Sequence, residues 1–204
     1  MAKERSKRTN RRSEILRAAE DLMVTEGLTG VTTRQISKKV GCSEGALYVH
    51  FKGRLELLLA MLEESLPDML DPFRTLQESI GRNSPNANLE MAITGIYKFQ
   101  NRVAPLFGSL FAEPKLLDAY RKYLTSQNKG PHLSIAVLER YITAEQKLGR
   151  INKQVDPKMS AYLLMSSLFF RAFVEHFFDR PMQPPWSKFA KGLVVAVVGS
   201  RDFR

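Results

Sequence analysis

The sequence predicts an all-α protein, with a three-helix N-terminal head and a C-terminal helical bundle, about nine helices in all. Apolar residues recur at a spacing of three and four along nearly the whole chain. No stretch shows the strict alternation of a half-buried strand, and glycine or proline separates the periodic segments. The 204 residues can bury a substantial core without disulfides, and Cys42 is the single cysteine.

Three short helices are predicted for the head. The first covers Ser13 to Glu26 and ends at Gly27. The second begins at Thr32, where Gln35 completes a capping box, and ends at Gly41; Ser43 caps the third, which reaches about His50. Such short helices are stable only when packed together, so we expect one core from Ile15, Leu22, Ile36, Val40, Leu47 and Phe51.

The remaining chain predicts a longer bundle. A helix from about Gly53 to Leu66 carries a leucine stripe, Pro67 ends or bends it, and a turn-rich loop covers Gly81 to Asn88. Further helices are expected over Leu89 to Ala104, Lys115 to Ser126, Pro131 to Leu148, Pro157 to Phe178 and Pro185 to Val198. We expect residues 1–52 to form one domain and residues 53–204 the other.

Charge is concentrated at the N-terminus. The first 54 residues hold 12 Lys/Arg and 6 Asp/Glu, which leaves +4 of the net +10 to the rest. A polyanionic partner and a merely solvated basic tail both fit this asymmetry. No secretory signal is visible, and the longest charge-free apolar stretch, Met159 to Phe170, is too short to cross a bilayer. We therefore expect a cytoplasmic protein with no membrane association.

The segment from Thr32 to His50 has the length and turn chemistry of a helix-turn-helix, whose second helix enters the DNA major groove. Gly41 suits the left-handed conformation at the turn. Small residues at Gly45 and Ala46 allow close approach to DNA. Side chains that can donate a hydrogen bond or carry a positive charge to DNA phosphates are present at Ser43, Tyr48, His50, Lys52 and Arg54.

Residues Gly27 to Leu57, GLTGVTTRQISKKVGCSEGALYVHFKGRLEL, resemble the DNA-binding signature of the TetR family of bacterial regulators. Shared features include the threonine pair, the Gly41 turn and the run Gly45 to Tyr48. The sequence departs from the family pattern at Met23, Ser37, Val40 and Arg54. The resemblance covers about the first quarter of the chain.

By this resemblance and the motif, eleven residues are predicted to bind DNA. They are Thr32, Thr33, Arg34, Ser43, Glu44, Gly45, Ala46, Tyr48, His50, Lys52 and Arg54. Arg34 either reads guanine through two hydrogen bonds or contacts phosphate. Tyr48 either contacts DNA or packs in the core. Glu44 either accepts from cytosine or supplies a favourable charge at the helix start.

Catalytic and metal sites are not predicted. The string Gly41-Cys42-Ser43-Glu44-Gly45 matches a hydrolase nucleophile elbow, but that motif requires a preceding strand, and a helix is expected here. Glu175 and His176 point about 100° apart on a helix, so together with Asp179 they make a poor metal site. No phosphate-binding loop, dinucleotide fingerprint or cysteine pair is present, so no cofactor is expected.

The bundle is expected to bind a small, largely apolar effector and to form a homodimer, chiefly because the resemblance implies both. The predicted pocket residues are Met91, Tyr97, Gln100, Asn101, Phe107, Phe111, Tyr123, Phe169, Phe170 and Phe173. The predicted dimer residues are Tyr162, Met165, Phe169, Phe173, Phe177, Phe189, Leu193 and Val197. The resemblance further implies a repressor that releases a palindromic operator when the effector binds. A helical adaptor whose basic tail meets acidic lipid or an acidic partner is the alternative.

Overall fold

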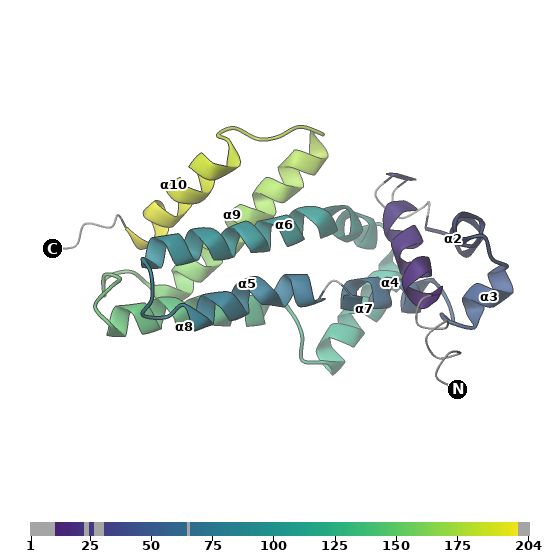
Figure 1. The fold of residues 1–204 in the computed structure, drawn as a ribbon, viewed down its shortest axis with the longest axis horizontal. Helices are drawn as coiled ribbons and strands as arrows, with labels where there is room; N and C mark the ends of the chain where they lie inside the picture. Colours follow the sequence, from purple (N-terminus) through teal and green to yellow (C-terminus); the bar gives the residue numbers. More distant parts are fainter. Residues whose placement is uncertain (1–10, 23–24, 27–30, 65, 200–204) are drawn as a thin grey trace. The chain divides into compact units, whose positions relative to one another are not determined.

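The computed structural model describes residues 11–22, 25, 26, 31–64 and 66–199, with their side chains except at positions 54, 58, 62, 64, 66–69, 106, 107 and 109. Within these residues the fold is all-helical, as the sequence predicts (Figure 1). Residues 11–22 are helical. They are followed by the helices α2(Thr33–Val40), α3(Glu44–Tyr48), α4(Arg54–Glu64), α5(Leu66–Glu78), α6(Pro85–Phe111), α7(Pro114–Ser126), α8(Pro131–Lys147), α9(Pro157–Phe177) and α10(Trp186–Val198).

The chain forms two compact units, and the first combines residues 1–66 with residues 105–123. Its core contains the apolar side chains that the sequence predicts for the head, including Ile15, Ile36, Leu47 and Phe51, each fully buried. Leu110 from the end of α6 and Leu116 from α7 join the same core. The three short helices therefore share one hydrophobic cluster, which supplies the stability that each lacks alone.

The second unit combines residues 67–104 and 124–204. One apolar face from each of α5, α6, α8, α9 and α10 contributes to its core, through residues such as Leu76, Ile93, Leu138, Leu164 and Val194. Asp156 begins α9 as predicted, because its side chain accepts a hydrogen bond from the backbone N–H of Met159 at 2.9 Å. No helix among the described residues is long and apolar enough to span a membrane.

Of two helix boundaries predicted at prolines, the one near Pro67 is found and the one at Pro105 was wrong. The leucine-rich helix α4 ends at Glu64, and Pro67 is the second residue of the next helix, α5, where a missing backbone N–H leaves no helical hydrogen bond unmade. Helix α6 does not stop before Pro105, and it continues to Phe111. Burial of Leu110 beyond the proline stabilises that continuation. The predicted loop Gly81 to Asn88 is also shorter, since α6 begins at Pro85.

A buried arginine fixes the connection between α9 and α10. The guanidinium of Arg171 donates to the carbonyls of Pro184 at 2.9 Å and Met182 at 2.8 Å, and it pairs with Glu175 at 2.9 Å. Glu175 also accepts from the hydroxyl of Tyr97, whose ring stacks on Trp186 with centroids 4.0 Å apart. This network connects α6, α9 and the start of α10.

Burial alone would raise the pKa of Glu175. The hydrogen bonds from Tyr97 and Met182 and the charge of Arg171 together outweigh that effect, and they hold the pKa below its usual value. Burial, followed by the hydrogen bond to Glu175, raises the pKa of Tyr97 to about 12. The network is therefore built for an ionised carboxylate and a neutral phenol.

Candidate DNA-binding interface

Helix α2 begins with the predicted cap. Thr32 has an extended backbone, and its hydroxyl oxygen accepts from the N–H of Gln35 at 3.2 Å. In a full capping box the side chain of Gln35 would bond to the backbone N–H of Thr32. Here its side-chain oxygen instead accepts from the Thr32 hydroxyl at 2.7 Å, so this half of the prediction was wrong. The cap fixes the start of α2 and leaves the side chain of Arg34 exposed.

The turn between α2 and α3 depends on Gly41. Its φ of 69° and ψ of 41° are left-handed, and its N–H donates to the carbonyl of Lys38 at 3.3 Å. The N–H of Cys42 donates to the carbonyl of Ser37 at 2.9 Å, which satisfies a second free carbonyl at the helix end. A side chain at position 41 would be strained there, so the predicted need for glycine is confirmed.

Helix α3 follows at once, with Ser43 as its N-cap. The Ser43 hydroxyl oxygen accepts from the N–H of Ala46 at 3.2 Å, which is a capping role. Ser43 also follows a helix, whereas a nucleophile elbow follows a strand. The carboxylate of Glu44 accepts from the hydroxyl of Thr33 at 2.9 Å, and this bond links the first turns of α2 and α3.

Most of the predicted DNA-binding residues lie on the surface of the head. The exposed ones are Thr32, Arg34, Ser43, Glu44, Gly45, Tyr48 and Lys52. The half-buried ones are Thr33, Ala46 and His50. The side chain of Arg54 lies outside the described residues. Tyr48 is 51 % exposed, which disfavours the alternative that its ring packs in the core.

Two further residues of the head were not predicted as candidates. Val49, at the C-cap of α3, has 63 % of its surface exposed, more than any other large apolar residue described in the head. Arg12 places its guanidinium 5.0 Å from the centroid of the Phe51 ring. Val49 has no side-chain group that can form a hydrogen bond, so a sequence criterion based on polar contacts to DNA does not select it. In the sequence, Arg12 is one cation of a basic run and has no pattern that singles it out.

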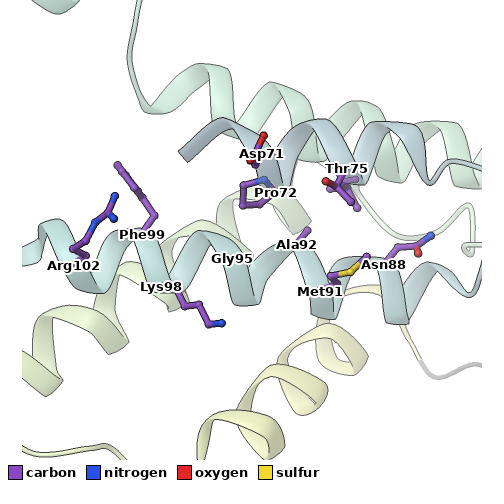
Figure 2. A pocket seen from close by; sticks show the side chains of 11 residues that line it. Asp71, Pro72, Thr75, Asn88, Met91, Ala92, Gly95, Lys98, Phe99 and Arg102 are labelled. Atoms are coloured by element: carbon purple, nitrogen blue, oxygen red, sulfur yellow. The ribbon is translucent and has the colours of Figure 1, made fainter. Parts of the chain in front are cut away.

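A cavity of about 570 Å³ lies between α5 and α6 in the second unit (Figure 2). Its lining is mixed, with apolar, amide and charged side chains: Asp71, Pro72, Thr75, Leu76, Asn88, Met91, Ala92, Gly95, Lys98, Phe99 and Arg102. The ring of Pro72 lies over Gly95, and a Cβ built at Gly95 would come within 2.5 Å of it. Glycine at this position therefore sets the close approach of the two helices.

Of the predicted pocket residues, Met91 lines this cavity. Tyr97 instead stacks on Trp186, and the Tyr123 hydroxyl donates to Glu63. The side-chain oxygens of Gln100 and Asn101 are buried without a hydrogen-bond partner among the described residues. Phe111, Phe169, Phe170 and Phe173 are exposed, and the side chain of Phe107 lies outside the described part.

One face of α9 is apolar and exposed. It includes four of the predicted dimer residues, Tyr162, Phe169, Phe173 and Phe177, with 47 to 69 % of their surface accessible. Met159, Leu163 and Phe170 extend the same face. The other predicted residues, Met165, Phe189, Leu193 and Val197, are half-buried against the core of the second unit.

The N-terminal part of the chain has recognisable relatives. Residues 15–61 match the family described as "Bacterial regulatory proteins, tetR family". The nucleoid occlusion factor SlmA of Vibrio campbellii is 48% identical over 65 residues, which are 30% of this chain and 33% of that protein. That match thus spans about a third of the relative's length. SlmA of Photobacterium profundum is 28% identical over 172 residues, 74% of this chain and 86% of that protein.

The whole fold also has solved counterparts. The SmeT–triclosan complex superposes with a TM-score of 0.69 at 21% identity, covering 96% of this chain and 98% of that chain. SmeT is described as the repressor of the Stenotrophomonas maltophilia multidrug efflux pump SmeDEF. At this identity the similarity establishes the fold, while the family match covers the helix-turn-helix itself. Residues 15–61 therefore carry a DNA-binding domain of the kind found in TetR-family regulators, and the chain as a whole shares the fold of the solved SmeT repressor.

Proposed function

We propose that the protein is a dimeric repressor that binds a palindromic operator and releases it when a small, largely apolar effector binds. Residues 1–52 are proposed to bind DNA, and residues 53–204 to sense the effector and to dimerise. The main support for the proposal is the geometry of the helix-turn-helix in residues 32–50. Two capped helices meet at a left-handed Gly41 and leave Arg34, Gly45 and Tyr48 exposed.

Direct sequence reading is assigned first to Arg34. Its guanidinium is exposed near the start of α2, and an arginine can bind O6 and N7 of guanine together. Thr33 and Glu44 are assigned a positioning role, because their 2.9 Å hydrogen bond holds the two helices in one geometry. Tyr48, His50 and Lys52 are assigned to phosphate contacts, which fix the register on the duplex.

Dimerisation is supported by the exposed face of α9. Seven large apolar side chains, Met159, Tyr162, Leu163, Phe169, Phe170, Phe173 and Phe177, are each at least 47 % exposed. Such a continuous apolar surface is typical of a protein interface. Packing against the same face of a second copy would give a symmetric helical interface, and two linked heads would then bind neighbouring half-sites.

An apolar effector is supported by the cavity between α5 and α6 and by the related fold of SmeT, solved with triclosan. Pro72, Leu76, Met91 and Phe99 supply apolar surface, while Lys98 and Arg102 supply charge. The mechanism we propose is a change in the separation of the two heads on effector binding. A coupling free energy of about 1 to 3 kcal/mol is typical of such linkage.

Replacement of Arg34 tests the reading role. In the full-length protein, Arg34→Ala should weaken binding to a selected operator by about tenfold, the loss of one base contact. Binding to random-sequence duplexes should weaken by no more than about twofold, because a single phosphate contact contributes little to them. Lys38→Ala, on the last turn of the same helix, is the matched control and should reduce both affinities equally. Equal losses with Arg34→Ala would refute base reading by this residue.

A further inference from the structure

We infer that α3 reads the methyl groups of thymine, and that Val49 is the residue that determines this preference. The inference rests on the proposed DNA-binding function and adds to it the chemistry that the recognition helix prefers. It predicts an operator half-site with thymine under Val49, beside the contact that Arg34 makes.

The surface of α3 carries few polar groups that could read a base. Its exposed residues are Glu44, Gly45 and Tyr48, and Val49 continues them at the helical C-cap. The hydroxyl of Ser43 already caps the helix, and the carboxylate of Glu44 already accepts from Thr33. No arginine, lysine, asparagine or glutamine lies between Ser43 and Val49, so the usual hydrogen-bonding partners of guanine and adenine are absent from this segment.

Val49 and Tyr48 offer apolar contact instead. They are 63 % and 51 % exposed, next to each other on a helix that otherwise buries Leu47 completely. A single exposed apolar residue needs no explanation, but here the side chain of Val49 lies next to the ring of Tyr48, whose hydroxyl is the group assigned to phosphate, so Val49 and that ring together present a small apolar surface to the groove. The chemical feature of the major groove that suits such a surface is the C5-methyl group of thymine.

Gly45 supports close approach at the same place. Position 45 precedes Tyr48 and Val49 by three and four residues, so the three lie on one face of the helix. A Cβ built on Gly45 would meet only the Ser43 hydroxyl oxygen, at 3.9 Å, which is ordinary contact. The fold therefore does not require glycine at position 45. Its missing side chain leaves room for a base edge beside Val49.

Uracil substitution provides the test, because it removes only the methyl group. A duplex is first selected from a random pool with the full-length protein. Each thymine of one half-site is then replaced by deoxyuridine, and dissociation constants are measured by fluorescence anisotropy. At least one substitution should weaken binding about threefold or more, the effect expected from one buried methyl group.

A double-mutant cycle identifies the residue involved. Val49→Ala should weaken binding to the thymine duplex about threefold or more. On the uracil duplex that weakens binding of the wild-type protein, the dissociation constant of Val49→Ala should stay within about twofold of the wild-type value. Leu133→Ala, an exposed aliphatic residue on α8, is the control variant and should change neither value. Circular dichroism and thermal midpoints establish that both variants fold.

Three outcomes would overturn the inference. If every uracil duplex binds as tightly as the thymine duplex, methyl groups are not read. If Val49→Ala weakens both duplexes equally, Val49 does not read the methyl group. These two outcomes leave the proposed function intact. If no duplex is enriched in the selection, the proposed function fails and the inference fails with it.

Discussion

Replacing Gly45 by alanine should separate the stability of the head from its affinity for DNA. Glycine lowers helix stability relative to alanine by about 0.5 to 1 kcal/mol. Position 45 lies in the first turn of α3, so the lower value applies. The added methyl group meets only the Ser43 hydroxyl oxygen at 3.9 Å, so no clash offsets the gain. We expect the thermal midpoint to rise by about 1 to 2 °C.

The same methyl group should weaken DNA binding. It would occupy the space between α3 and the base edges, and overpacking an interface by one methyl group costs about 1 to 3 kcal/mol. The lower half of that range corresponds to a loss of affinity of about five- to thirtyfold. Differential scanning calorimetry and anisotropy titration of a selected duplex measure the two effects on the same preparation.

Gly108→Ala is the matched control. Gly108 lies inside α6, and a Cβ built there meets nothing within 4 Å. It should raise the thermal midpoint at least as much as Gly45→Ala and leave DNA affinity unchanged. The reasoning is refuted if Gly45→Ala binds DNA as tightly as wild type, or if it lowers the thermal midpoint.

Three further predictions concern the second unit. Arg171→Leu should lower the free energy of unfolding by about 3 to 5 kcal/mol, because it leaves the carboxylate of Glu175 without its buried cation. The control, Arg74→Leu, removes an exposed ion pair with Asp71 and should lower it by about 1 kcal/mol or less. Equal losses of the two variants in urea titrations would contradict the account. Phe173→Glu should convert the proposed dimer to a monomer in sedimentation equilibrium, and an unchanged mass would argue against the α9 face as its interface. Burial raises the pKa of Tyr97 and Tyr141 to about 12, so the stability they contribute is fully present below their usual value of 10.0 and is lost as pH rises through 12. Phenolate absorbance should therefore show tyrosines that ionise late, with one fewer in Tyr97→Phe; an identical titration of that variant would contradict this.

Local signals in the sequence predicted the head well. Thr32, Gly41 and Ser43 act through their own backbone neighbourhoods, so their roles could be inferred without knowledge of the tertiary fold. The same holds for Asp156 at the start of α9. Capping and left-handed turns involve residues only a few positions apart, and a short pattern therefore specifies them.

Features that depend on distant residues were not predictable in this way. The extension of α6 past Pro105 depends on burial of Leu110 among residues of the head, and local propensity argues against it. Tyr97 was expected near a ligand, but its partner Glu175 lies 78 residues away and holds it beside Trp186. The bond between Thr33 and Glu44 likewise requires the relative placement of two helices.

Selection of duplexes from a random pool tests the central claim most directly. The full-length protein, without effector and at about 0.15 M salt, should enrich an inverted repeat whose half-sites are centred about one helical turn apart. Equal retention of all sequences under these conditions would contradict the assignment of α2 and α3 as the element that reads DNA.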